Sequence, residues 1–298
     1  MTLTRGTVSV SHLEGTKVGY RMLASNPSSP TLLLIIPFTT TVDYYLPEFE
    51  NQQLTERVNL IAIEPLGHGT TETRAQTITY WDSALAFLET LDALGIDQAF
   101  VMGTSQGGWI AARMALLAPS RVRGIILIGT SMDAESAASR ELGCWDGCEA
   151  TAALVQLSHD LSPMPDFVTG DGYSDFLMDI GYGKGVTQVL RKKWAESIRS
   201  IYSGDAGKRK ICMAAVCISS RDGLHSRLPH IECPVLWMQG TDDVVFSVAN
   251  AEKEIKLFKN APEARLIPMQ GGVHFLSFTH EKEIHQNILQ FIGRWKST

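Results

Sequence analysis

One serine in this sequence lies between two glycines directly after an apolar run. In the stretch Phe100-Val-Met-Gly-Thr-Ser-Gln-Gly-Gly-Trp109, Ser105 comes two residues after Gly103 and two before Gly107. The pentad alone is a weak signal, but an amphipathic pattern that ends at Pro119 follows it. This order predicts a strand, a sharp turn and a helix, the setting in which a strained turn presents a serine hydroxyl as a nucleophile. The start of the helix would direct its free N–H groups toward a developing oxyanion.

A serine nucleophile needs a general base, and His274 is the candidate that its surroundings favour. It lies in Met269-Gln-Gly-Gly-Val-His-Phe275, where a Gly-Gly loop follows the apolar run Leu266–Met269. A flexible loop at the end of such a run lets the histidine reach back across the edge of a sheet. His280 and His285 fall at the start and within the last predicted helix, where surface or capping roles are expected. We therefore expect His274 to be the base.

The third member of such a site is a carboxylate that orients the imidazole. Two aspartates, Asp242 and Asp243, follow the apolar run Val235–Met238 and Gly240. Asp243 is favoured because the acid in such a loop usually comes three residues after the glycine that ends the strand. Asp242 is the first alternative and Asp133, which follows the preceding apolar run, is the second.

The elements that must position these residues are predicted by hydrophobic patterning. Continuous apolar runs bounded by turn residues are typical of strands buried on both faces of a parallel sheet. They occur at Leu32–Ile36, Leu60–Ile63, Phe100–Met102, Ile125–Ile128 and Val235–Met238. Helical patterns lie between them, for example within residues 79–96, and a final helix is expected at Glu281–Trp295. With an antiparallel edge in residues 7–23, the alternation predicts an α/β fold with a doubly wound, mostly parallel sheet.

The alternation of strands and helices breaks between Asp133 and about Leu228. This stretch has helix-like segments and Gly-rich turns but no clear buried strand, and the strand pattern resumes near Cys233. We predict a core domain of residues 1–133 and 229–298, with residues 134–228 forming a helical cap over one end of the sheet. Some apolar cap side chains should line a substrate cavity. The candidates are Trp145, Phe167, Phe176, Trp194 and Met213.

Composition narrows the class of protein. The 298 residues carry a formal net charge of −6, and their basic residues are scattered, which argues against nucleic acid as a partner. No apolar run approaches the length of a membrane span, and the first residues lack a secretory signal pattern. Five cysteines with no C-x-x-C spacing indicate reduced thiols. We expect a cytoplasmic protein that binds a small molecule, without membrane association and without a metal or cofactor; its oligomeric state stays open.

The order Ser105, Asp243, His274 resembles that of the α/β-hydrolase superfamily. The Gly67-His68-Gly69 turn after an apolar run, and the loop that begins at Gly271, are similar to loops of that superfamily. The resemblance covers nearly the whole chain, with the predicted cap in the place of the family's helical cap. It is nearest to the lidded esterase and lactonase branch, which has many fungal members. It implies an α/β-hydrolase fold and a catalytic triad.

One loop departs from the family pattern. Members usually carry His-Gly after the third strand, whereas this chain reads Ile35-Ile36-Pro37-Phe38-Thr39. Proline has no N–H to donate. Phe38 keeps its N–H, so an oxyanion hole formed by the N–H groups of Phe38 and Gln106 survives. Loss of one donor would cost about 3 kcal/mol of transition-state stabilisation, so the conformation of this loop decides how fast the reaction is.

Together these residues predict an enzyme that uses a serine nucleophile to hydrolyse a medium-sized, largely apolar ester or lactone through an acyl-enzyme. The same triad also serves C–C bond hydrolysis of a β-diketone-type substrate, which the sequence does not separate from ester cleavage. A ligand-binding, receptor-like protein on the same scaffold is the alternative from another class.

Overall fold

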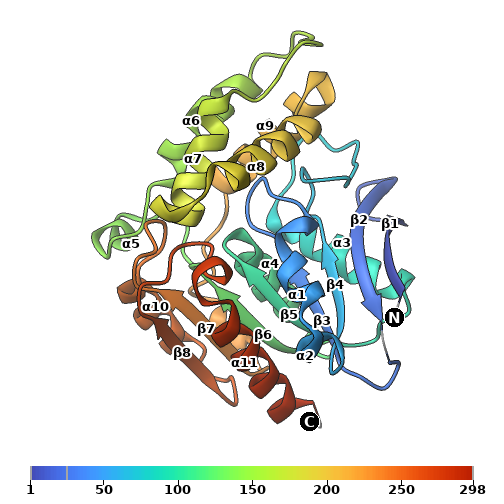
Figure 1. Cartoon of the computed structure of the whole chain (residues 1–298), viewed down its shortest axis with the longest axis vertical. Helices are drawn as coiled ribbons and strands as arrows, with labels where there is room; N and C mark the ends of the chain where they lie inside the picture. Colours follow the sequence, from blue (N-terminus) through green and yellow to red (C-terminus); the bar gives the residue numbers. More distant parts are fainter. Residues whose placement is uncertain (1, 25, 297–298) are drawn as a thin grey trace.

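A computed structural model of the chain describes residues 2–24 and 26–296. The described residues form one eight-stranded sheet with the order β1-β2-β4-β3-β5-β6-β7-β8 (Figure 1). The strands are β1 (Thr2–Val10), β2 (Thr16–Ala24), β3 (Thr31–Ile35), β4 (Asn59–Ile63), β5 (Ala99–Thr104), β6 (Val122–Ile128), β7 (Val235–Gly240) and β8 (Ala264–Met269).

The sheet is parallel from β4 to β8 and antiparallel only at the β1–β2 edge and where β2 meets β4. The predicted doubly wound, mostly parallel sheet and its antiparallel edge are confirmed. Successive residues of β3 explain the continuous apolar runs, because Leu33 and Ile35 pack into the core on one face while Leu32 and Leu34 pack on the other. A strand that is buried on both faces has no polar side to show in its sequence.

Helices cover both faces of this sheet. The core helices are α1 (Leu46–Glu50), α2 (Gln52–Thr55), α3 (Tyr80–Ala93), α4 (Gln106–Leu117), α10 (Val248–Glu254) and α11 (Ser277–Trp295). Buried side chains of α3, α4 and α10 belong to one core cluster, and those of α1, α2 and α11 belong to the other. The two clusters therefore lie on opposite faces of the sheet, as a doubly wound fold requires.

Local sequence accounts for the ends of the core helices. Thr79 and Asp82 form a capping box at the start of α3. Gly95 follows the helix with φ of 68°, a left-handed conformation that suits glycine at a helix end. In α11, His280 has non-helical dihedrals (φ −132°, ψ 34°) and interrupts the helix. The regular part that follows this interruption agrees with the predicted helix, which the sequence pattern began at Glu281.

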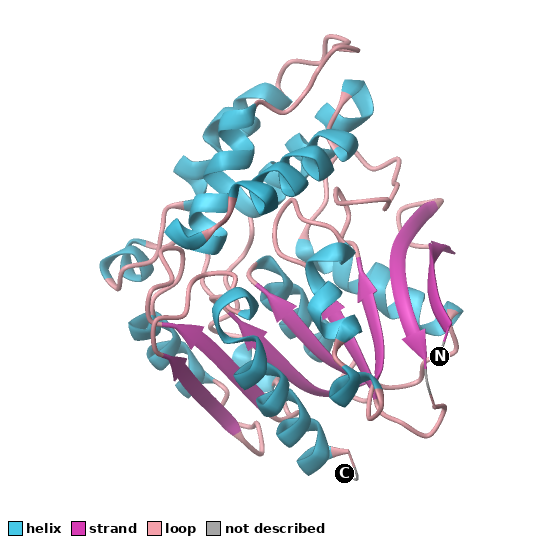
Figure 2. Ribbon diagram, viewed as in Figure 1, coloured by secondary structure: helices cyan, strands magenta, loops and turns pink. Residues whose placement is uncertain are grey.

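The segment between β6 and β7 is helical. It contains α5 (Ala137–Glu141), α6 (Gly147–Ser158), α7 (Asp171–Tyr182), α8 (Gln188–Ile201) and α9 (Gly204–Ser219). Figure 2 shows these helices as a separate layer beyond the carboxyl ends of the parallel strands β3 to β8, to which the arrows of those strands point. The division of the chain into a core and a cap at residues 134 and 228 stays a prediction.

Two connections join the helical layer to the core: residues 129–136 follow β6, and residues 220–234 lead to β7. They run side by side, and we call them the neck. The N–H of Leu224 donates to the carbonyl of Met132 at 2.7 Å. Beside it, the buried side chains of Glu135 and Arg221 form an ion pair, and the Arg221 guanidinium lies 3.9 Å from the centre of the Trp109 ring on α4. The ion pair and the ring contact join the two connections to each other and to α4.

Candidate active site

Ser105 occupies a strained turn between β5 and α4. Its φ of 53° and ψ of −122° lie outside the conformations common for residues other than glycine. The turn is tight because its glycines touch backbone: a Cβ on Gly103 would lie 2.1 Å from the carbonyl of Gly107, and one on Gly107 would lie 2.3 Å from the carbonyl oxygen of Ile35. The strand–turn–helix setting inferred from the sequence is present. Gln106 is the first residue of α4, where backbone N–H groups have no partner within the helix.

His274 forms a buried pair with Asp243. The Nδ1 atom of His274 lies 3.0 Å and 3.1 Å from the two carboxylate oxygens of Asp243. Backbone N–H groups of Val245 and Phe246 donate to Oδ1 of Asp243 at 2.8 Å and 3.0 Å, and the amide of Gln239 donates to Oδ2 at 2.8 Å. Both side chains of the pair are nearly enclosed, with 3% exposure for His274 and 8% for Asp243. The carboxylate is therefore held by donors from several sides and fixes Nδ1 of the imidazole.

The two alternative acids lie elsewhere. Asp242 is exposed and accepts a hydrogen bond from the hydroxyl of Thr241 at 3.1 Å. Asp133 accepts from the backbone N–H of Ala134 at 2.8 Å and from the hydroxyl of Ser136, so its carboxylate serves its own loop. The structure thus brings Asp243, and neither alternative, to His274.

Ser105 and the His274–Asp243 pair lie at the same end of the sheet, because each follows the carboxyl end of a parallel strand. The N–H of Ser105 donates to the carbonyl of Ile128 at 2.9 Å. A Cβ on the next residue, Gly129, would lie 2.7 Å from the carbonyl oxygen of His274 and 3.3 Å from a carboxylate oxygen of Asp243. Within the described residues, no hydrogen bond joins the side chains of Ser105 and His274. Such catalytic hydrogen bonds are often long without substrate and tighten when it binds.

The loop after β3 has an unusual backbone. Thr39 has a φ of 54°, and both the N–H and the hydroxyl of Thr40 donate to the carbonyl of Pro37. The ring of Phe38 packs edge-on against the ring of His68 at 5.9 Å. Pro37 therefore contributes its carbonyl to the turn while Phe38 keeps its N–H. The assignment of that N–H to an oxyanion hole stays a prediction.

His68 is buried and holds the side chain of Gln106. The sequence alone indicates no role for this histidine beyond its motif. The Nδ1 atom of His68 lies 3.0 Å from the carbonyl of Leu66, and Nε2 lies 2.9 Å from the side-chain nitrogen of Gln106. Burial lowers the pKa of His68 to about 4, so the ring is neutral near neutral pH. A neutral ring that donates through Nδ1 accepts the Gln106 amide through Nε2. The Gly67-His68-Gly69 motif was the available signal, but nothing in the sequence indicates its distant partner.

Two of the five expected cavity residues lie on the core side of the helical layer. Trp145 contacts an apolar cluster built around Phe38, and its ring centre lies 6.4 Å from that of Phe246, which in turn lies 5.7 Å from His274. Met213 on α9 is buried in the core cluster on the α4 face of the sheet. No pattern in the sequence singles out Phe246, although it comes three residues after Asp243.

The other three expected cavity residues lie in different surroundings. Trp194 is buried and lines a separate pocket of about 310 Å³ with Tyr182 and Phe275. Phe167 is half-buried at the edge of a core cluster. Phe176 on α7 is 40% exposed, so it lies at the surface of the helical layer. Periodicity identifies an amphipathic helix, but it does not say which of several aromatic residues faces the sheet.

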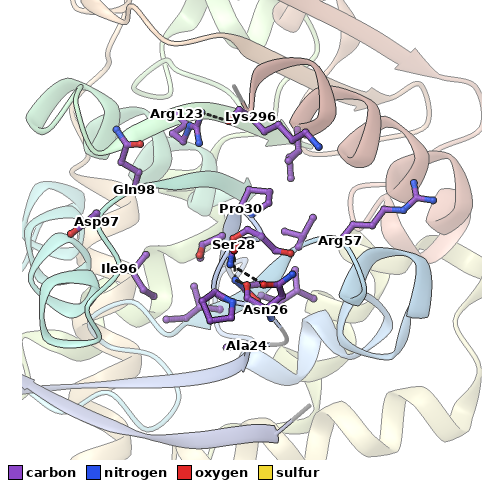
Figure 3. Close-up of a pocket in the computed structure, with 18 of the residues that line it drawn as sticks. Ala24, Asn26, Ser28, Pro30, Arg57, Ile96, Asp97, Gln98, Arg123 and Lys296 are labelled. Carbon is purple, nitrogen blue, oxygen red and sulfur yellow. Dashed lines mark hydrogen bonds between the residues drawn. The ribbon is translucent and has the colours of Figure 1, made fainter. Parts of the chain in front are cut away.

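A broad pocket of about 1150 Å³ lies at the opposite ends of the strands (Figure 3). Asn59 begins β4, and Thr31 and Arg123 lie at the starts of β3 and β6, so this pocket is at the amino ends of the strands. In open α/β sheets, ligands bind outside the carboxyl ends. The pocket is therefore not the site at Ser105.

Residues 2–24 and 26–296 offer neither a metal-binding cluster nor a membrane-spanning helix. They contain no cluster of three His, Cys, Asp or Glu side chains able to hold a metal ion. Across the same residues, no helix combines the length and apolar character that a membrane crossing requires.

Comparison with known proteins adds sequence and structural relatives. A family model described as the alpha/beta hydrolase fold matches residues 30–143. The chain is 29% identical over 215 residues to the polyketide synthase ThaQ of Burkholderia thailandensis, covering 71% of this chain but only 9% of that protein. It is 27% identical to a putative 2-succinyl-6-hydroxy-2,4-cyclohexadiene-1-carboxylate synthase of Bacillus subtilis, covering 89% of this chain and 92% of that one.

A solved carboxylesterase of Bacillus subtilis superimposes with a TM-score of 0.75 at 17% identity, over 98% of this chain and 92% of that one. At this identity the likeness concerns the fold.

Proposed function

The chain has the α/β-hydrolase fold, and on that premise we propose that it is a serine hydrolase of medium-sized, largely apolar carboxylic esters or lactones. In the proposed reaction the hydroxyl of Ser105 attacks the substrate carbonyl, and His274 takes the proton and returns it to the leaving group. Asp243 holds His274 and stabilises its charged form. The N–H groups of Phe38 and Gln106 stabilise the oxyanion. In the second half of the reaction, His274 takes a proton from water as the water attacks the acyl-enzyme. The proton is then returned to the oxygen of Ser105 as the acid leaves.

The proposal depends on one observation. The buried His274–Asp243 pair and the strained Ser105 lie together at the carboxyl ends of the strands. A buried carboxylate that accepts hydrogen bonds on both oxygens and holds an imidazole is the arrangement that activates a serine. A turn that forces a serine to φ of 53° stores strain that a merely structural residue does not need. Together the two features support catalysis as the function of this site.

The expected substrate class follows from the side chains near Phe38. We call these the apolar roof; its members are Phe38, Ala214, Ala215 and Ile218, with Trp145, Leu154, Val155 and Tyr173 packed against them. An acyl or alcohol group that contacts the roof would be largely apolar. We propose a cytoplasmic location, which suits the five free cysteines.

Covalent labelling tests this function. A fluorophosphonate should modify the wild-type protein, and mass spectrometry of the digest should find the adduct on Ser105. The Ser105→Ala variant is the matched control and should stay unlabelled. Wild-type protein that folds but carries no adduct on Ser105 would contradict the proposal.

C–C bond hydrolysis is the second candidate. The same three residues would carry it out, since this reaction also begins with attack on a carbonyl carbon. Fast turnover of simple p-nitrophenyl esters would favour the ester reading. Cleavage of a β-diketone with much slower ester turnover would favour C–C hydrolysis by the same three residues.

A further inference from the structure

We propose that helix α7 positions both catalytic loops, with Tyr173 near its start holding the loop of Phe38 and Gly181 near its end holding the loop of His274. The inference rests on the proposed function, because it concerns the same site. In this reading Tyr173 and Gly181 are positioning residues, and the helical layer completes the catalytic arrangement in addition to covering it.

The first contact is a hydrogen bond between α7 and the loop of Phe38. The hydroxyl oxygens of Tyr173 and Thr39 lie 2.7 Å apart. Thr39 is fully buried and has a φ of 54°, so its backbone is held in a conformation that a threonine rarely adopts. Such a conformation persists only where surrounding contacts fix it. Tyr173 supplies one from outside the loop, next to the residue whose N–H would stabilise the oxyanion.

The second contact joins α7 to the loop of His274. The N–H of Phe275 donates to the carbonyl of Gly181 at 2.7 Å. The ring of Phe275 stacks on the imidazole of His274, with centres 5.5 Å apart and an interplanar angle of 30°. It also packs edge-on against Tyr182 at 5.0 Å. The residue that follows the proposed base is therefore fixed by the last turn of α7.

The close approach at Gly181 needs the absence of a side chain. A Cβ there would lie 2.3 Å and 2.4 Å from two ring carbons of Phe275. Gly181 therefore lets the helix backbone lie directly against the ring that stacks on His274.

One rigid helix carries both contacts. Tyr173 and Gly181 are eight residues apart, which is about 12 Å along the axis and on one side of the helix. Within this span Leu177 and Met178 are buried. A helix of this length moves as a unit, so a displacement of α7 would disturb the proposed oxyanion donor and the proposed base together. The spacing of the two loops is thus set by the length of the helix.

The first experiment measures the bond between Tyr173 and Thr39 in the full-length protein. The rate constant for phosphonylation by a fluorophosphonate is the readout, because it needs the serine, the base and the oxyanion donors but no known substrate. We expect Tyr173→Phe and Thr39→Val each to lower the maximal rate constant about tenfold, with the half-saturating probe concentration changed less than about twofold. The double variant should be no slower than either single variant, because both remove one bond.

Two further variants separate positioning from general stability. Thr39→Ser keeps the hydroxyl and should retain most of the wild-type rate. Thr151→Val is the matched control for Thr39→Val, since the buried hydroxyl of Thr151 donates at 2.7 Å to the carbonyl of Gly147 within α6. It should keep the wild-type rate even where its melting temperature falls.

The second experiment tests the contact at Gly181. Gly181→Ala should slow phosphonylation by at least about tenfold and shift the acidic limb of its pH profile, because the added methyl displaces Phe275 and with it His274. Phe275→Leu removes the ring carbons with which that methyl would collide. Adding Gly181→Ala to the Phe275→Leu variant should therefore lower the rate constant for phosphonylation by less than about threefold. The difference between the two backgrounds keeps the test valid if Gly181→Ala alone folds poorly.

The outcomes separate this inference from the function on which it rests. Wild-type protein without an adduct on Ser105 would overturn the proposed function and the inference with it. A labelled wild type whose Tyr173→Phe and Thr39→Val effects are additive or negligible would overturn the role of α7 alone. An unchanged pH profile in the Gly181→Ala variant would also overturn it. The same holds if Gly181→Ala lowers the rate constant equally in the wild type and in the Phe275→Leu variant.

Discussion

His68 makes the stability of the fold depend on pH in a defined window. Burial lowers its pKa to about 4, whereas an exposed histidine titrates near 6.5. The unfolded chain therefore binds a proton at His68 at a pH where the folded chain does not. The stability that the neutral ring contributes is present above about pH 6.5 and is lost as the pH falls toward about 4. The main cause of the lowered pKa is desolvation by burial, to which the positive charge of Lys210 adds.

The magnitude follows from the two pKa values. The full separation of about 2.5 units corresponds to about 3 kcal/mol. Between about pH 7 and about pH 5, the difference in proton binding gives a loss of about 2 kcal/mol in the free energy of unfolding. That is a large share of the stability of an ordinary domain.

Urea denaturation of the wild type and of His68→Asn, at several values between about pH 7 and about pH 5, measures this effect. Asparagine does not titrate, so the variant should lose about 2 kcal/mol less than the wild type over that interval, whatever its stability at about pH 7. Other titrating groups are common to both proteins and cancel in the comparison. Parallel pH dependences in the two proteins would refute the assignment of a buried, neutral His68.

Further predictions concern other charged side chains. Asp243→Asn should lower kcat by about three to four orders of magnitude with little change in fold, because an amide no longer fixes the required tautomer of the base; steady-state kinetics and circular dichroism check this. Arg221→Met should lower the free energy of unfolding by about 3–5 kcal/mol, because it leaves Glu135 buried without its partner, and urea denaturation measures the loss. A hydrogen bond to Glu254 raises the pKa of His225. The resulting stabilisation is complete below about pH 6.5 and is lost as the pH rises through the raised pKa, so the wild-type melting temperature should fall over that window while that of His225→Asn falls less.

The residues of the candidate site differ in how far sequence alone could place them. Ser105 was identifiable because its strain is created within five residues, by a strand, two glycines and a helix start. The choice of Asp243 rested on its distance from Gly240, and the structure pairs that residue with His274. Local backbone geometry decides both cases, and local geometry leaves a trace in the sequence.

The contacts between distant segments left no such trace. Nothing near Gln106 indicates that its side chain meets His68, because the contact depends on how two loops pack. The same limit applies to α7, where the sequence does not distinguish Phe176, which is exposed, from Tyr173, which reaches Thr39. The strands were predictable because burial on both faces requires continuous apolar runs. The orientation of a surface helix is decided only by what it packs against.

The neck, with its hydrogen bond from Leu224 to Met132, limits where the helical layer joins the sheet and so affects how such a protein can change over evolutionary time. Because both connections leave the sheet at one place, the inserted helices can diverge in sequence while the strands and the serine turn are preserved. New specificities can then arise in the insertion without rebuilding the folding core. Helix α7 sets the boundary of that freedom, since a replacement insertion would still have to meet Thr39 and Phe275.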